Sequence, residues 1–159
     1  MKTWHHCASR RVDFGDTDMA GIVHFSKYFC YIEFAEHEFF RKLGFSVAQK
    51  YGDLQYGWPR VKVAAEFLSP LRFEDELEIR LRLNKISTRS IGYEFSIVKK
   101  SDQTIAAIGS YTTVCVIHNS DGGFRSAHLP EELSKCMKSL EFDTHNEPIQ
   151  HLRQDSDDR

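Results

Sequence analysis

The chain has 159 residues, of which 41% are hydrophobic and 13% aromatic, and its formal net charge is −2. This length suits one domain with its own core, and the balanced charge argues against a nucleic-acid-binding protein, which typically shows a basic excess. The sequence has no apolar run of about 18 residues, as a membrane-spanning helix requires, and its N-terminus lacks the apolar centre of a signal peptide. We therefore expect a cytoplasmic protein with neither a nucleic-acid nor a membrane partner.

The cysteines are widely spaced and form no Cys-x-x-Cys pair, which argues against a zinc site or a redox motif. Free thiols in a reducing compartment are the better interpretation. They are Cys7, Cys30, Cys115 and Cys136.

The first third of the chain predicts a strand, a loop and one long helix. Residues 4–14 are expected to form the strand and residues 15–23 the loop. Ser26 is a suitable N-cap for a helix that runs to about Leu43, with apolar residues at helical spacing. Gly44 is a good residue to end it.

After a loop rich in glycine and aromatic residues, at 51–59, the apolar period changes from 3.6 to 2, which predicts strands. We expect these strands at about residues 61–67, 77–83, 91–97 and 105–117. A short helix is expected after Pro130, and residues 143–159 form a polar tail that we expect to be flexible.

One long helix and a mostly antiparallel sheet of about five strands predict an α+β domain, which we place at residues 1–142, before the tail at 143–159. The helix is apolar over much of its circumference, so it needs cover on more than one side. A curved sheet around the central helix provides that cover. The sheet still has apolar surface to bury, which favours a dimer joined through sheet edges or faces.

The densest cluster of reactive groups lies just before the long helix. Asp16, Asp18, Gly21 and His24 fall within nine residues. A carboxylate there can attack a carbonyl carbon or act as a base, while the free N–H groups of the helix start polarise the carbonyl oxygen. Gly21 would let the backbone approach a substrate closely.

Each of these residues also has a plainer interpretation. Asp16 is expected to cap the turn through its own backbone, and Asp18 considered alone could do the same. A calcium loop is excluded because its twelfth position would be Lys27 rather than Glu. His24 is more often a loop or packing histidine, with a direct catalytic role as the alternative.

Two motifs carry a resemblance to a known family. The first is Asp16-Thr-Asp18-Met-Ala-Gly21-Ile-Val, followed by Tyr28-Phe29 and Glu33, and the second is the segment from Ser69-Pro70 to Ile79. Over about residues 10–130 the chain resembles the 4-hydroxybenzoyl-CoA thioesterase family, whose branches include short-chain acyl-CoA thioesterases and 1,4-dihydroxy-2-naphthoyl-CoA hydrolases.

The resemblance implies a hotdog fold, hydrolysis of an acyl-CoA thioester, and assembly as a homodimer or homotetramer. The implied reaction needs no separate cofactor, because coenzyme A is part of the substrate. It also needs no metal. The resemblance makes Asp18 the catalytic carboxylate and places the oxyanion donor at the Phe25 backbone N–H. Some branches have a histidine at that position, whereas here His24 stands one place earlier.

The resemblance also suggests residues that contact the substrate. Another branch carries its catalytic acid on the long helix, so Glu33 and Glu36 are lesser candidates, with solvent or interface charges as the plainer interpretation. Arg89 and Ser90 resemble the nucleotide contact, often made across a subunit boundary, and a solvated turn is the alternative. Trp58 and Pro59 would line the acyl pocket, although Trp58 also suits a dimer core.

We therefore predict an acyl-CoA thioesterase for an aromatic or a short-to-medium acyl group. The alternatives are a non-catalytic acyl-CoA-binding protein, a hydratase or dehydratase, and a thioesterase for acyl carrier protein. A binding protein has no need of Asp18, His24 lacks the partner arrangement of a hydratase, and the near-neutral charge gives little support for acyl carrier protein.

Overall fold

The computed structural model describes residues 3–141, so the tail predicted at 143–159 lies outside the described residues. The elements in chain order are β1 (His6–Arg11), the 3-10 turn η1 (Phe14–Asp16), α1 (Phe25–Lys42), β2 (Lys50–Tyr51), β3 (Leu54–Gly57), β4 (Arg60–Phe67), β5 (Glu76–Ile86), β6 (Ser90–Lys99), β7 (Ile105–Val114), β8 (Val116–His118), β9 (Phe124–Ser126) and α2 (Glu131–Glu141).

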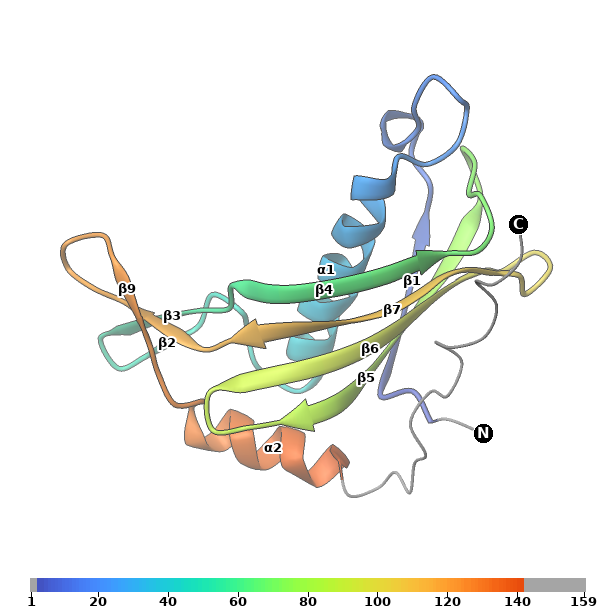
Figure 1. Cartoon of the computed structure of the whole chain (residues 1–159). Helices are drawn as coiled ribbons and strands as arrows, with labels where there is room; N and C mark the ends of the chain where they lie inside the picture. Colours follow the sequence, from blue (N-terminus) through green and yellow to red (C-terminus); the bar gives the residue numbers. More distant parts are fainter. Residues whose placement is uncertain (1–2, 142–159) are drawn as a thin grey trace, which may run out of the picture.

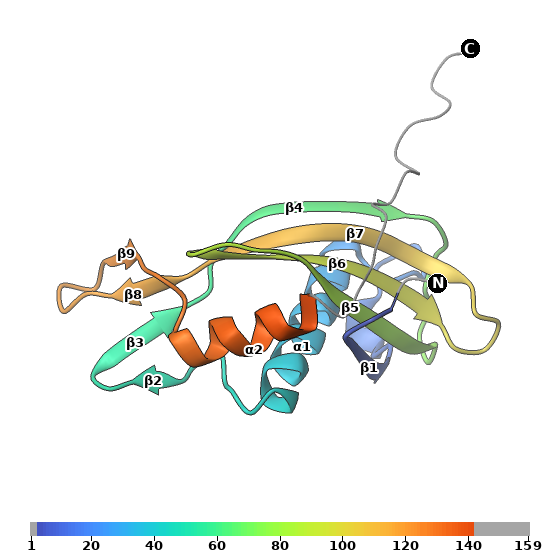
Figure 2. The same ribbon diagram turned by 90° about the horizontal axis from the view of Figure 1, so that it is seen from below.

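The main sheet has five strands in the order β1-β5-β6-β7-β4, and every neighbouring pair is antiparallel. Figures 1 and 2 show this sheet arching over α1, which lies across its concave face. The strands are long and alternate apolar with polar residues, so one face of the sheet is available to cover a helix. The predicted α+β class with an antiparallel sheet is confirmed.

The core forms where the inner face of the sheet meets α1. Leu77, Ile79 and Leu81 of β5 are fully buried. Ile79 and Leu81 stand in register with the buried Ile97 and Phe95 of β6. Ala35 and Phe39 of α1 belong to the same buried cluster. The apolar face of β5, set by its period of 2, therefore packs against the apolar face of α1, as the sequence predicts.

A second, smaller sheet extends from one end of the first, in the order β2-β3-β8-β9. Figure 2 shows it projecting away from α1. The loop predicted at 51–59 is wrong, because these residues form a hairpin that turns at Gly52, whose φ is +62°. The single strand predicted at 105–117 is interrupted at Cys115 and gives β7 and β8.

The two ends of α1 are set by short-range chemistry. His24 is the N-cap, and its side chain accepts from the Ser26 N–H, so the predicted cap at Ser26 is wrong by two residues. The helix ends at Lys42. Gly44 follows with φ of +85°, a left-handed conformation that favours glycine and confirms the predicted stop.

The second helix, α2, confirms the prediction made after Pro130 and lies against β5. Its apolar residues Leu133 and Met137 are fully buried. The four cysteines are unpaired, as expected. No helix within residues 3–141 is long and apolar enough to cross a membrane.

The edge strand β4 is unusual in what it exposes. Val61 is 63% exposed, Val63 43% and Phe67 47%. β7 pairs with one edge of β4. The backbone groups of the opposite edge pair with no strand within residues 3–141. An apolar, unpaired edge of this length is a template for association with another chain.

Candidate active site

The loop before α1 is a small closed hairpin. Thr17 and Val23 form an isolated antiparallel bridge, and the His24 N–H donates to the Asp16 carbonyl at 2.9 Å. Near the tip, the Gly21 N–H donates to the Asp18 carbonyl at 3.0 Å. Gly21 has φ of +72°, so glycine serves the turn that presents Asp18, and it does not line the pocket described below.

Asp18 is exposed at the tip of this hairpin and makes a local turn bond, which is the plainer of the two roles expected for it. Its Oδ1 accepts from the Ala20 N–H at 2.8 Å. The second oxygen, Oδ2, makes no hydrogen bond within residues 3–141. One oxygen therefore fixes the carboxylate, and the other is free to react.

Phe25, the first residue of α1, lines the same pocket as Asp18. Within the described residues no acceptor takes the Phe25 N–H, as is usual for the first turn of a helix. The dipole of an 18-residue helix adds partial positive charge at this end. An oxygen that gains negative charge near Phe25 would therefore be stabilised.

His24 serves the start of the helix directly. Its Nδ1 lies 2.8 Å from the Ser26 Oγ and accepts from the Ser26 N–H at 3.4 Å. Because Nδ1 accepts, the neutral ring carries its proton on Nε2. The imidazole also packs on the Phe25 ring, with 4.7 Å between centroids.

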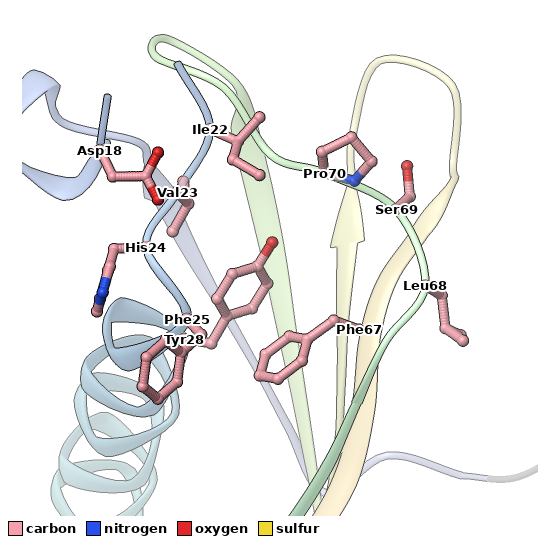
Figure 3. Close-up of a pocket in the computed structure, with 10 residues that line it drawn as sticks. All are labelled: Asp18, Ile22, Val23, His24, Phe25, Tyr28, Phe67, Leu68, Ser69 and Pro70. Atoms are coloured by element: carbon pink, nitrogen blue, oxygen red, sulfur yellow. The ribbon is translucent and has the colours of Figure 1, made fainter. Parts of the chain in front are cut away.

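The pocket has a volume of about 530 Å³, which is within the usual range for small-molecule sites. Figure 3 shows the Asp18 carboxylate turned inward, with the rings of Tyr28 and Phe67 facing each other beneath it. These rings meet edge to face at 4.9 Å. Ten residues line the pocket: Asp18, Ile22, Val23, His24, Phe25, Tyr28, Phe67, Leu68, Ser69 and Pro70.

The two sequence motifs are brought together here. The Val23 N–H donates to the Leu71 carbonyl at 2.8 Å, so the segment after β4 supports the loop. The Arg72 guanidinium lies 3.5 Å from the Gly21 carbonyl, and the Arg72 N–H donates to Asp75 at 2.8 Å. Ser69 and Pro70 form the opposite wall of the pocket.

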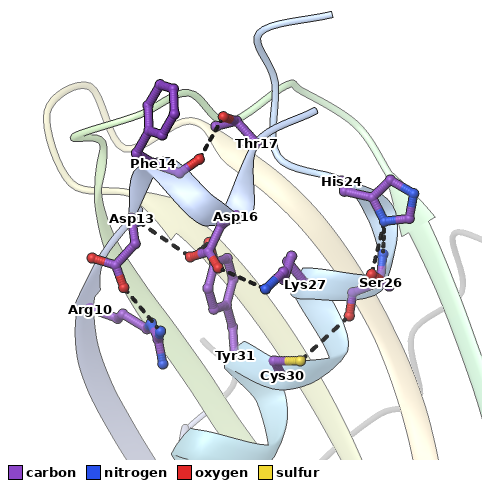
Figure 4. A network of polar contacts seen from close by, with 10 residues as sticks. All are labelled: Arg10, Asp13, Phe14, Asp16, Thr17, His24, Ser26, Lys27, Cys30 and Tyr31. Atoms are coloured by element: carbon purple, nitrogen blue, oxygen red, sulfur yellow. Dashed lines mark hydrogen bonds and ion pairs between the residues drawn. The ribbon is translucent and has the colours of Figure 1, made fainter. Parts of the chain in front are cut away.

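Asp16 caps its own turn, where its Oδ2 accepts from the Asp13 N–H at 3.3 Å. It is also buried, and its carboxylate has further partners on α1. Figure 4 shows its carboxylate between Lys27 and Tyr31. The Tyr31 hydroxyl donates to Oδ2 at 2.7 Å, and the Lys27 Nζ is 3.3 Å from Oδ1. Burial favours the neutral acid, but these partners and the Asp13 N–H outweigh it and hold the pKa of Asp16 below its usual value.

The two helical acids have different surroundings. Glu33 is exposed and pairs with Arg60 at 3.0 Å. Glu36 is buried and also pairs with Arg60. Burial raises the pKa of Glu36 to about 7, although Arg60 acts in the opposite direction. Neither acid lines the Asp18 pocket.

The remaining predicted substrate contacts lie elsewhere in the same chain. Trp58 packs on Phe40 at 5.5 Å, and Pro59 immediately precedes β4, so both lie at the end of the sheet opposite Phe67. Ser90 is paired with Val114 at that same end. Arg60 and Phe67 are seven steps apart along β4, which is roughly 23 Å at about 3.3 Å per residue. One chain therefore does not bring these residues to Asp18.

Ser90 and Arg89 have local roles within the chain. The Ser90 Oγ lies 2.6 Å from the Ser87 Oγ, and the Ser90 N–H donates to the same oxygen at 3.0 Å. The exposed Arg89 lies 3.5 Å from His128. Arg89 therefore remains available at the surface, whereas Ser90 shapes the turn.

Sequence reasoning missed Tyr28, Phe67 and Leu68 as pocket residues. Tyr28 was assigned to the helix, and its position one turn after Phe25 is the signal that could have placed it at the pocket. Phe67 ends its strand, and only the fold places it across from Tyr28. Within residues 3–141, no group of three His, Cys, Asp or Glu side chains is arranged to hold a metal ion.

Comparison with known proteins places the chain among thioesterases. Residues 12–136 match the model of the thioesterase-like superfamily. A protein of Aquifex aeolicus (strain VF5) named "Putative esterase" is 31% identical over 129 residues, which cover 81% of this chain and 94% of that protein. A 1,4-dihydroxy-2-naphthoyl-CoA hydrolase of Prochlorococcus marinus (strain NATL2A) is 30% identical, over 61% of this chain and 67% of the relative.

The structural comparison agrees with these relatives. A solved gentisyl-coenzyme A thioesterase superposes with a TM-score of 0.71 at 28% identity, covering 82% of this chain and 98% of its own. The two motifs that carry the resemblance thus belong to a fold shared with known thioesterases. The hotdog type of fold predicted from them is confirmed.

Proposed function

Because the chain belongs to the thioesterase-like superfamily, we propose that it hydrolyses an acyl-CoA thioester to the free acid and coenzyme A. The observation that supports this most directly is the pairing of a half-free carboxylate with an unpartnered helix N–H in one pocket. The first group can supply the attack, and the second can stabilise the charge that the attack creates.

Asp18 is the catalytic carboxylate in this proposal. Its free oxygen attacks the thioester carbon or takes a proton from the attacking water, and in either route the carbonyl oxygen becomes negative. The Phe25 N–H then donates to that oxygen. Losing one donor of this kind typically costs about 10²–10³ in rate. His24 maintains this helix start as its N-cap.

The acyl group occupies the apolar part of the pocket. Phe25, Tyr28 and Phe67 offer ring faces and edges, which suit a flat aromatic acyl group and also accept a short-to-medium aliphatic one. Two relatives are named for aromatic acyl-CoA substrates, 1,4-dihydroxy-2-naphthoyl-CoA and gentisyl-CoA. We therefore rank aromatic acyl-CoAs first.

The full site requires a second copy of the chain in this proposal. Two copies that join antiparallel along the exposed edge of β4 bring the Arg60 end of one strand beside the Phe67 end of the other. Trp58, Pro59 and Arg89 of the partner subunit then approach the pocket that Asp18 lines. Residues that lie about 23 Å apart at the two ends of β4 in one chain become neighbours across the two copies. This supports a homodimer as the working unit.

Thiol release from a panel of aromatic, short and medium acyl-CoAs tests the proposal, with Asp18→Asn and the remote surface variant Asp53→Asn measured in parallel. Turnover by the native protein and by Asp53→Asn, with a loss of at least 100-fold in folded Asp18→Asn, would support it. Binding of acyl-CoA without turnover would instead identify a binding protein. Activity that survives in Asp18→Asn would move the chemistry to another group, with Glu33 and Glu36 next to be changed.

A further inference from the structure

Asp16 is a buried acid beside the proposed site, yet it does not line the pocket. Only 6% of its surface is exposed. A carboxylate buried to this degree is costly unless hydrogen bonds or opposite charges compensate for the lost water. Both compensations are present, because Tyr31 donates a short hydrogen bond and Lys27 supplies a positive charge.

Both partners of the Asp16 carboxylate belong to α1. Lys27 is in the first turn of the helix, and Tyr31 is one turn further along. The contact between Asp16 and Tyr31 is buried and joins residues fifteen positions apart. The side chain of Asp16 therefore attaches the loop to the helix by interactions that the loop's own turn does not provide.

The backbone of Asp16 makes a second attachment at the same place. Its carbonyl accepts from the His24 N–H at 2.9 Å, directly before the helix begins. The bridge between Thr17 and Val23 lies next to it. Asp16 thus closes the base of the hairpin that carries Asp18 at its tip, and it binds the helix whose first N–H belongs to Phe25.

We infer that Asp16 is a positioning residue, which uses Tyr31 and Lys27 to hold the Asp18 hairpin in fixed register with the N-terminus of α1. For the reaction itself this inference rests on the proposed function. A displacement of about 1 Å between reacting groups can cost about 100-fold in rate. The two rings that face each other in the pocket, Tyr28 and Phe67, lie outside this hairpin, on α1 and β4.

The test compares Asp16→Asn, Tyr31→Phe and the double variant. Each single variant should keep its fold by circular dichroism and lose about 10- to 100-fold in kcat, while KM changes less than threefold. The double variant should lose little more than the worse single variant, because both changes break the same contact. A role limited to stability would lower Tm and leave kcat of the folded protein unchanged.

Two matched controls separate this effect from the chemical change alone. Asp53→Asn makes the same substitution on the exposed β2–β3 turn. Tyr93→Phe removes a fully buried hydroxyl that has no hydrogen bond among the described residues. Both should match the native kcat. Values of kcat within twofold of native for Asp16→Asn and Tyr31→Phe, or losses that multiply in the double variant, would overturn the inference.

Hydrogen exchange gives a readout that needs no turnover. Amides of residues 17–25 should exchange faster in Asp16→Asn and Tyr31→Phe than in the native protein, and Asp53→Asn should not differ from native. If the native protein releases no thiol from any substrate, the proposed function fails, and faster exchange would still support the attachment. Unchanged exchange would contradict the attachment whatever the activity.

Discussion

Arg60, on the exposed edge strand β4, holds the carboxylate of Glu36, which is almost completely buried on α1. The same guanidinium reaches the exposed Glu33 at 3.0 Å and lies 5.8 Å from the centre of the Tyr111 ring. Tyr111 also lowers the pKa of Glu36, although its hydroxyl makes no hydrogen bond of good geometry among the described residues. Burial still dominates and leaves the pKa of Glu36 near 7.

This pair predicts a pH-dependent stability. In the unfolded chain Glu36 loses its proton near pH 4.5, whereas in the folded protein it keeps the proton until about pH 7. Unfolding therefore releases a proton between these values, so rising pH favours the unfolded state. The free energy of unfolding should fall by up to about 3 kcal/mol from this group.

Urea unfolding of native protein, Glu36→Gln and Glu33→Gln at several pH values between 4.5 and 8 measures this effect. The difference in unfolding free energy between the native protein and Glu36→Gln should decrease steadily with pH. Glu33→Gln changes an exposed partner of the same arginine and keeps Glu36. The difference in unfolding free energy between the native protein and Glu33→Gln should therefore show no such slope. A native curve parallel to that of Glu36→Gln would contradict the assignment.

The N-cap of α1 predicts separate effects of His24 on stability and on chemistry. His24→Ala removes the acceptor for the Ser26 N–H and should lower the free energy of unfolding by about 1 kcal/mol. His24→Asn retains a capping oxygen and should recover most of that loss together with native kcat. A His24→Asn variant that is stable but slow would show that the imidazole itself takes part in the reaction.

Phe67 predicts how the pocket distinguishes acyl groups. Phe67→Ala removes a ring that contacts the acyl group in the proposed complex, and one aromatic contact is worth about 1 kcal/mol, or about fivefold in KM. KM for an aromatic acyl-CoA should rise by that factor, while KM for acetyl-CoA changes little. Phe124→Ala, which truncates an exposed phenylalanine on β9 outside the pocket, is the control. Equal changes for both substrates would remove Phe67 from the acyl site.

At Gly109 of β7 the neighbouring backbone and side chains leave no space for a side chain. A Cβ at this position would lie 2.1 Å from the Ala64 carbonyl oxygen and 2.6 Å from the Phe95 ring. Gly109→Ala should therefore destabilise the fold by several kcal/mol, about as overpacked core variants do at their worst. Thermal unfolding should show almost no change for Gly15→Ala, where an added Cβ meets nothing within 4 Å.

The exposed edge of β4 predicts the assembly. Val63→Asp places a charge in the middle of that edge and should convert the protein to a monomer of native secondary structure, with thiol release reduced at least tenfold. Sedimentation analysis measures the first effect. Leu54→Asp, on the second sheet, replaces an apolar residue that is 42% exposed and should leave the assembly unchanged. A Val63→Asp variant that remains dimeric would exclude β4 as the interface.

Local patterns were sufficient for most of the individual elements. The period of 2 in β5 and the helical period before Gly44 specify which residues face inward, because side-chain direction follows directly from backbone geometry. The hairpin at Gly52 was missed because its strands are short and gain their stability from β8, which lies some sixty residues later in the chain. Propensity within such a segment carries little information about a distant partner.

The sequence by itself determined the strand and helix periods, and its two motifs identified the family and pointed to Asp18. Only the tertiary structure decided that Asp18 is exposed at the tip of its hairpin, that Asp16 is buried against Tyr31, and that Phe67 faces Tyr28. The physical reason is that a local pattern specifies a residue's direction within its own element. Burial, partners and the pKa of a side chain such as Glu36 are set by whichever other element packs against it.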